Sequence, residues 1–311
     1  MTIFLFLIIA RWIHFASVFA LFGCSLFWFY AVAGGSLAGA RQLPQAFAAT
    51  RNLLRAAAIA AAVSGVGWLG AILVNMTSDF GSLIDPQTWR LFFFETGFGA
   101  VSILRLGLLA AALSIVILPW RDCRSLKGLA AISGLLLVSQ AWLGHAAEGG
   151  AGLYGAAMIA TYGAHALAAG AWVGGLPPLL FALSELRRGD PQCASAECLN
   201  ILSRYSAMAM AAVAAIVASG LGNAAFRVGG SFGKLFDTSY GDALFAKTIL
   251  AAAMLALACF NRFVAPPKLR ASPLQGMTQM VKLAHSVAFE LALGVFVLGA
   301  AAVLGITPPP Q

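Results

Sequence analysis

The sequence YGAAMIATYGAHALAAGAWVGGLPPLLF, from Tyr154 to Phe181, decides the class of this protein. It is apolar for longer than the about 20 residues that a helix needs to cross a bilayer, yet it carries His165 near its middle. Met158, His165 and Trp172 are seven residues apart, so they lie along one face of the predicted helix. An ionisable ring at bilayer depth costs free energy. We therefore expect His165 to serve the function of the protein.

Two glycines and two prolines follow near the far end of this stretch, at Gly174, Gly175, Pro177 and Pro178. Proline has no N–H to donate within a helix, so each proline removes one backbone hydrogen bond. We expect the helix to be weakened at this end.

The composition is that of a membrane protein. Hydrophobic residues make up 61% of the chain and charged residues 10%, whereas soluble domains carry about a quarter charged residues. Long continuous apolar runs favour helices over the alternating strands of a β-barrel. The net charge of +8 is better explained by basic loops near anionic headgroups than by binding of nucleic acid. The fold class predicted is an all-α polytopic membrane protein in the lipid bilayer.

Eight apolar segments are long enough to span the membrane. They are Ile3–Ala33, Arg55–Thr77, Gly97–Trp120, Leu126–Ala146, Leu153–Leu183, Ser206–Phe226, Ala243–Phe263 and Leu283–Ile306. The odd-numbered connections hold thirteen lysines and arginines and the even-numbered ones hold four. Because basic loops stay in the cytoplasm, both termini are predicted to face the periplasm of a bacterial inner (cytoplasmic) membrane.

The two halves of the chain, 1–146 and 147–311, share three patterns in the same order. These are His14-x8-Gly23 with His165-x8-Gly174, Ser64-Gly65-x-Gly67 with Ser219-Gly220-x-Gly222, and Glu95 through Arg105 with Asp237 through Lys247. Each half has four spans, so both halves run in the same direction. The patterns predict a single domain of two parallel four-helix repeats, with functional sites between the repeats.

The repeat places His14 and His165 at matching depths, roughly 17 Å into the membrane. We expect the two rings to face each other between the halves, where neutral imidazoles hold Cu, Zn or haem iron. The alternative is a structural role, in which each buried ring bonds to a backbone carbonyl or a hydroxyl.

Four further residues are candidate metal ligands. Met158, one heptad outward of His165, offers a thioether suited to Cu(I). Met76 and His145 end the second and fourth spans on the outer side, and His285 begins the last span near the cytoplasm. Methionines that fill gaps, and histidines exposed in loops or contacting headgroups, are the structural alternatives. Glu290 in the last span needs a partner or a proton of its own.

Several catalytic signatures are missing from the sequence. There is no phosphate-binding P-loop, no HExxH zinc motif and no nucleophile elbow. The five cysteines form no CxxC pair. These absences argue against ATP-driven transport and hydrolase chemistry, and we expect that the protein is not an enzyme.

The sequence resembles the CopD/PcoD family of copper-resistance inner-membrane proteins over nearly its whole length. The motifs that carry the resemblance are HALAAGAWVGGL at 165–176, RYS at 204–206, SGLGN at 219–223, and Tyr240-Gly241 through Lys247 to Asn261-Arg262 and Pro266. The resemblance implies eight spans, a role in moving copper across the cytoplasmic membrane for copper homeostasis, and a separate periplasmic copper-binding partner of the CopC type.

The residues and the resemblance together lead to one hypothesis and two rivals. His145 and Met76 would receive a copper ion, His14 and His165 with Met158 would hold it at mid-membrane, and His285 would lie toward the exit. One rival is a membrane redox protein that holds b-type haem between paired histidines. The other is an assembly factor that delivers copper to an enzyme without transporting it.

Overall fold

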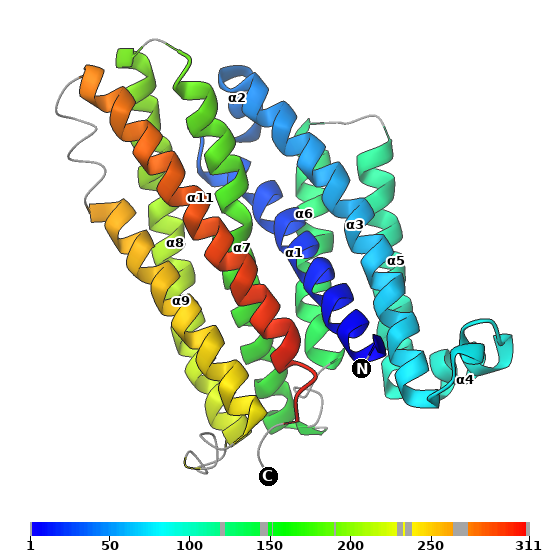
Figure 1. Ribbon diagram of the computed structural model, residues 1–311. Coiled ribbons are helices and arrows are strands. Elements are labelled where there is room, and N and C mark those ends of the chain that lie inside the picture. Colours follow the sequence, from blue (N-terminus) through cyan, green and yellow to red (C-terminus); the bar gives the residue numbers. More distant parts are fainter. Residues whose placement is uncertain are drawn as a thin grey trace.

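The computed structural model describes residues 2–118, 122–143, 149–150, 152–189, 191–228, 233, 238–263 and 273–308. These residues form helices and turns and contain no strand. Eight of the described helices are long and apolar enough to cross a membrane, which confirms the predicted fold class (Figure 1). They are α1 (Thr2–Tyr30), α3 (Pro44–Thr77), α5 (Gly97–Ile117), α6 (Asp122–Ser139), α7 (Leu153–Leu186), α8 (Pro191–Val228), α9 (Ser239–Phe263) and α11 (Pro273–Leu304).

Short helices occupy some of the connections. They are α2 (Gly35–Gln42), the 3-10 helices Phe80–Leu83 and Gln140–Leu143, and α4 (Pro86–Glu95). Helix α4 projects from the end of the bundle beside α5 (Figure 1). The carboxylate of Asp85 caps α4 by accepting the backbone N–H groups of Gln87 at 3.1 Å and Thr88 at 3.0 Å, and Pro86 follows as the first residue. The Asp-Pro pair signals this helix start, although the sequence prediction had no helix here.

Three spanning helices begin well before their predicted starts: α3 at Pro44 rather than Arg55, α8 at Pro191 rather than Ser206, and α11 at Pro273 rather than Leu283. The start of α3 is stabilised from another helix. The carboxylate of Glu185, at the end of α7, accepts the backbone N–H of Gln45 at 3.2 Å and of Ala46 at 2.7 Å. Hydropathy alone misses such an extension because its residues are polar and its cap lies far away in the sequence.

Helix α1 is the centre of the bundle. It packs against α3, α6, α7 and α11, and Leu21, Cys24, Phe27 and Trp28 are completely buried. Both described chain ends lie toward the same end of the bundle (Figure 1), as an even number of spans requires. The part of α1 from Leu21 to Trp28 is therefore surrounded by protein, whereas Ile9 and Ile13 nearer its start are exposed.

Helices α1 and α7 cross in backbone contact at two glycines. A Cβ on Gly23 would lie 2.3 Å from the carbonyl carbon of Gly174 and 2.5 Å from the oxygen of Gly170. A Cβ on Gly174 would lie 2.0 Å from the oxygen of Phe19 and 2.9 Å from the Cα of Gly23. The contact is reciprocal, because Phe19 and Gly23 have the same spacing as Gly170 and Gly174. Only glycine allows this approach; the two-repeat arrangement as a whole stays a prediction.

The same crossing compensates for a proline in α7. The helix continues to Leu186 although it contains Pro177 and Pro178. Pro178 has no N–H for the carbonyl of Gly174, four residues earlier. The thiol of Cys24 on α1 donates to that carbonyl at 3.2 Å. The expected weakening therefore does not interrupt the helix, because a neighbouring helix supplies the missing donor.

Candidate functional site

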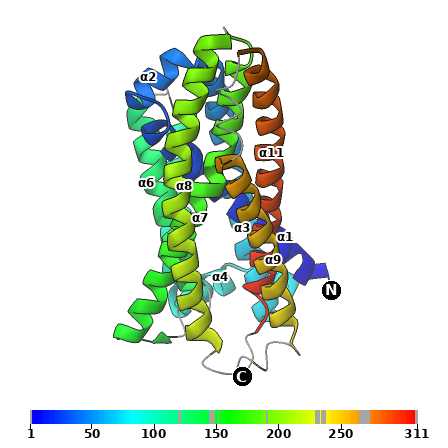
Figure 2. The ribbon, with the colours of Figure 1, turned by 90° about the vertical axis from the view of Figure 1, so that its left-hand side faces the viewer.

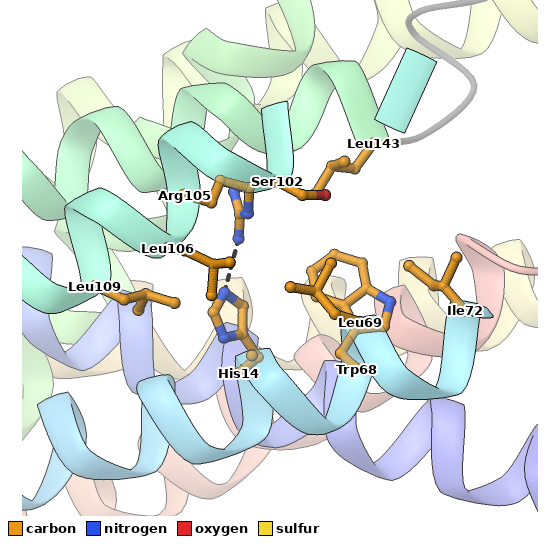
Figure 3. Close-up of a pocket in the computed structure, with 10 residues that line it drawn as sticks. His14, Trp68, Leu69, Ile72, Ser102, Arg105, Leu106, Leu109 and Leu143 are labelled. Carbon is orange, nitrogen blue, oxygen red and sulfur yellow. Dashed lines mark hydrogen bonds between the residues drawn. The ribbon is translucent and has the colours of Figure 1, made fainter. Parts of the chain in front are cut away.

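His14 lies on α1 and is 1% exposed. Its Nδ1 is 2.9 Å from the backbone oxygen of Ala61 on α3, so this nitrogen carries the hydrogen and donates it. Its Nε2 therefore holds the lone pair, and it accepts a hydrogen bond of 2.7 Å from Nη2 of Arg105 on α5 (Figure 3). Both ring nitrogens of His14 are thus occupied by protein groups.

Arg105 is itself buried and bound on three sides. Its Nη1 donates to the backbone oxygen of Leu136 and to Oγ of Ser139, both at 2.7 Å. The guanidinium carbon also lies 5.7 Å from the centre of the Trp68 ring, within cation–π range. Among the described residues it has no carboxylate partner. Arg105 therefore joins α5 to α6 and α1 through neutral acceptors and fixes the His14 ring.

A small cavity lies beside this pair. His14, Trp68, Ser102 and Arg105 line it together with apolar side chains (Figure 3). Its volume of about 20 Å³ is enough for about one water molecule. His14 thus lies in a nearly closed environment that protein side chains fill almost completely.

His165 lies on α7 and is partly exposed. Its Nδ1 is 3.1 Å from Oγ of Ser219 on α8. The Ser219 hydroxyl donates its own hydrogen to the backbone oxygen of Ala215 at 2.5 Å, so the His165 Nδ1–H must be the donor to Ser219. The ring also contacts the backbone oxygen of Ile216, which is an acceptor. The Nε2 of His165 then keeps a lone pair, for which the described part of the chain supplies no donor. Lys247 on α9 is close enough to interact electrostatically but makes no hydrogen bond to the ring.

The two rings do not face each other, contrary to the prediction. His14 bonds to α3 and α5, and His165 bonds to α8, so each ring takes its partners within its own half. The reason lies in the spacing to the crossing glycines. Nine residues separate His14 from Gly23, and at about 100° per residue they turn the side chain about half a revolution away. Because Gly23 faces α7, His14 faces the opposite side, and the same holds for His165 and Gly174.

The helices around the two histidines pack differently. Helix α3 packs against α5, whereas the described parts of α8 and α9 share at most a marginal contact. Figure 2 shows α9 beside α11, with the lower part of α9 apart from α8, although Arg262 at the other end of α9 bonds to Ser206 on α8. Helices α8 and α9 are also the least buried of the described spans. The Nε2 side of His165 therefore faces a more open region than that of His14.

The remaining candidate ligands are dispersed. Met158 is buried on the same face of α7 as His165, about 10 Å away along the helix axis. Met76 is 53% exposed at the end of α3, and His285 is exposed on α11. His145 lies in the stretch 144–148, outside the described residues. Within the described ranges, no three histidine, cysteine, aspartate or glutamate side chains form a metal-binding group.

One polar cluster was only half predicted. The sequence indicated that Glu290 needs a partner, but it did not indicate which groups supply one. The carboxylate accepts from Nε1 of Trp172 on α7 and from Nδ2 of Asn261 on α9, both at 3.0 Å. Trp172 is the third member of the heptad series on α7, and this spacing is the one signal in the sequence that pointed to it.

Comparison with known proteins gives the same family over both halves of the chain. Residues 1–156 match the family model "Copper resistance protein D-like, N-terminal domain", and residues 199–304 match "Copper resistance protein D". No solved structure matches the chain.

Three curated proteins illustrate the relationship. The copper resistance protein D of Pseudomonas syringae pv. tomato is 29% identical over 310 residues, 97% of this chain and 96% of that protein. The inner membrane protein YebZ of Escherichia coli K12 is 27% identical over 263 residues, 84% of each chain. The copper transport protein CutJ of Bacillus subtilis is 33% identical over 243 residues, 76% of this chain and 41% of that longer protein. With its eight apolar helices, the chain is a multi-pass inner-membrane protein with a copper-related function, and it belongs to the copper resistance protein D family.

Proposed function

We propose that the protein carries copper ions across the inner membrane, with His165 as the ligand at mid-membrane. The relatives named for copper resistance and copper transport support the cargo. The observation that carries the site is the lone pair on His165 Nε2, which the described residues leave without a partner. A neutral imidazole whose other nitrogen is bonded to Ser219 is a preorganised metal ligand.

The rest of the path follows the face of α7. Met158, one heptad toward the outer end, offers a soft thioether that suits Cu(I). His145 and Met76 are proposed to receive the ion at the periplasmic mouth, and His285 to lie toward the cytoplasmic exit. Weak binding at successive positions lets an ion enter and leave. This orientation, with both termini in the periplasm, rests on the distribution of basic residues between the loops.

His14 has a different role in this proposal. The guanidinium of Arg105 occupies the lone pair that a copper ion needs. A copper ion and Arg105 are both cations, so they compete for this nitrogen and repel each other at short range. His14 is therefore proposed to organise the first half, and to bind copper only when Arg105 is displaced.

The test is copper flux into liposomes that contain the purified protein. We expect His165→Ala to lower the initial rate about tenfold or more, because the mid-membrane ligand is lost. Tyr154→Phe is the matched control on the same helix, since it removes only a 3.5 Å hydrogen bond to Phe226 and should leave the rate unchanged. Equal rates for wild type and His165→Ala would contradict the assignment of His165.

The same preparations separate the transporter from its rivals. A strong Soret band that shifts on reduction would identify a b-type haem protein. Stoichiometric copper binding without flux would identify an assembly factor. The proposed transporter catalyses no reaction and takes its copper from a separate periplasmic protein of the CopC type. Acceleration of flux by such a copper-loaded donor, compared with an equal concentration of free copper, tests that partnership.

A further inference from the structure

A second site lies deeper in the bundle, around a carboxyl group that the copper path does not use. Glu290 is on α11 and is 3% exposed. Both of its carboxylate oxygens accept one hydrogen bond, Oε1 from Trp172 Nε1 and Oε2 from Asn261 Nδ2. Three spanning helices therefore meet at this side chain.

No positive charge compensates this carboxylate among the described residues. The basic residue nearest in sequence to its partner Asn261 is Arg262, which instead donates to Oγ of Ser206 on α8 at 2.5 Å. An ionised carboxylate at bilayer depth, held only by two neutral donors, costs several kcal/mol. Binding of a proton removes that cost.

Asn261 carries the observation that points to a proton. Its side chain is 6% exposed, and its Oδ1 has no hydrogen-bond partner among the described residues. The two ends of an amide have nearly the same shape, so rotation by about 180° exchanges Oδ1 with Nδ2. With Glu290 ionised, Nδ2 donates to Oε2. With Glu290 protonated, the rotated Oδ1 accepts the carboxyl O–H. Each protonation state of Glu290 thus has a matching orientation of Asn261.

The other groups at this site are neutral. From α8, the hydroxyl of Tyr205 donates to the backbone oxygen of Trp172 at 2.8 Å and lies within electrostatic range of Glu290. Beyond Tyr205, the buried hydroxyl of Tyr30 on α1 interacts with Tyr205 and lacks a hydrogen-bond partner in the described part of the chain. Helices α7 and α9 contribute Trp172 and Asn261. Trp172 and Asn261 direct N–H groups at the carboxylate, and these hydrogens repel a metal cation.

We propose that Glu290 is an exchangeable proton site inside the helix bundle, and that the side-chain amide of Asn261 rotates by about 180° when the proton binds. The proposal concerns a ligand other than copper and side chains other than the proposed copper ligands, although α7 and α11 carry residues of both. It therefore stands or falls independently of the copper path.

The test is infrared difference spectroscopy of the full-length purified protein during a pH titration. We expect the carbonyl band of a protonated carboxyl group to grow as the pH falls, and to disappear completely in Glu290→Gln. Glu185→Gln is the matched control, because Glu185 also accepts two N–H groups but lies at a helix end. It should leave the band in place. Absence of a titrating band in the wild type would overturn the proposal.

Asn261→Leu provides the second measurement, with Glu290 intact. Leucine supplies no acceptor, so the carboxyl O–H loses its partner and the carbonyl band should move to higher frequency. An unchanged band position would overturn the role of Asn261. Repeating the titration with sodium replaced by N-methylglucamine tests the competing ligand. A band that follows sodium rather than pH would identify a metal-cation site and overturn the proton site.

Discussion

The surroundings of His14 and His165 are alike on one side of the ring and different on the other. On the Nδ1 side, each ring packs against a glycine of the second helix in its half. A Cβ on Gly65 would lie 3.2 Å from Cε1 of His14, and a Cβ on Gly220 would lie 3.6 Å from Cε1 of His165. On the Nε2 side, His14 meets Arg105 at 2.7 Å, whereas the described residues leave His165 without a partner.

The difference comes from the third helix in each half rather than from the histidine helices. Arg105 on α5 and Lys247 on α9 occupy matching positions in the sequence. Helix α5 packs against α3 and brings a planar, five-donor guanidinium to His14. Helix α9 hardly packs against α8, which it meets through the bond from Arg262 to Ser206, and the Lys247 ammonium makes no hydrogen bond to His165. Similar motifs thus leave both ring nitrogens of His14 bonded, whereas Nε2 of His165 has no partner among the described residues.

The largest effect should come from the crossing on which both environments depend. Gly23→Ala places a Cβ against the backbone of α7, which cannot move aside without separating the helices. We expect a loss of about 3 kcal/mol in the free energy of unfolding, measured as a lower thermal midpoint in detergent. Gly107→Ala is the control, because a Cβ on Gly107 has nothing within 4 Å. A stability of Gly23→Ala equal to that of Gly107→Ala would refute the close crossing.

Replacing each histidine in turn should lower the free energy of unfolding by different amounts. His14→Leu leaves a buried donor of Arg105 without an acceptor, which costs about 2 kcal/mol or more. His165→Leu should cost less than about 1 kcal/mol, because Ser219 keeps its bond to Ala215. Chemical or thermal unfolding of the two variants measures the contrast. Equal destabilisation would show that the two sites are energetically equivalent.

Removal of the Arg105 side chain should make the first half resemble the second. Arg105→Leu frees the Nε2 lone pair of His14, and we expect about one more copper ion to bind per chain. Lys247→Leu is the control and should add none, since Lys247 does not occupy a ring nitrogen. Metal analysis of the folded, monodisperse fraction gives the result. Copper content unchanged from wild type in Arg105→Leu would argue against competition between Arg105 and copper.

The smallest effect should come from the hydroxyl that orients His165. Ser219→Ala removes the acceptor of the Nδ1–H, and we expect copper affinity to fall about tenfold. Ser64→Ala is the counterpart in the first half. Its hydroxyl bonds within its own helix to Ala60 at 2.5 Å and does not touch the ring, so copper affinity should not change. A titration in which both serine variants bind alike would remove Ser219 from the site.

Much of the site was predictable from the sequence, although one inference from it was wrong. The depth of His165 and its position on the Met158 face follow from residue counts along an apolar helix. The nine-residue spacing between His165 and Gly174 also predicts where the ring points, because it places His165 on the side of α7 opposite the contact with α1. We expected facing rings because the glycine was not used as the marker of the helix contact.

The rest was not predictable, because it depends on partners far apart in the chain. His14 and Arg105 are 91 positions apart, and Trp172 and Glu290 are 118 apart. The early start of α3 likewise depends on a cap from Glu185, 139 positions away from Ala46, which hydropathy does not register.

The sequence by itself determined a helical membrane protein with eight spans and membership in a copper resistance family. These follow from composition, from local periodicity and from motifs, all of which are properties of contiguous residues. Only the tertiary structure decided which histidine keeps a free nitrogen and which groups surround Glu290. The physical reason is that a ring nitrogen is bonded only if the packing of a third helix brings a donor within about 3 Å of it.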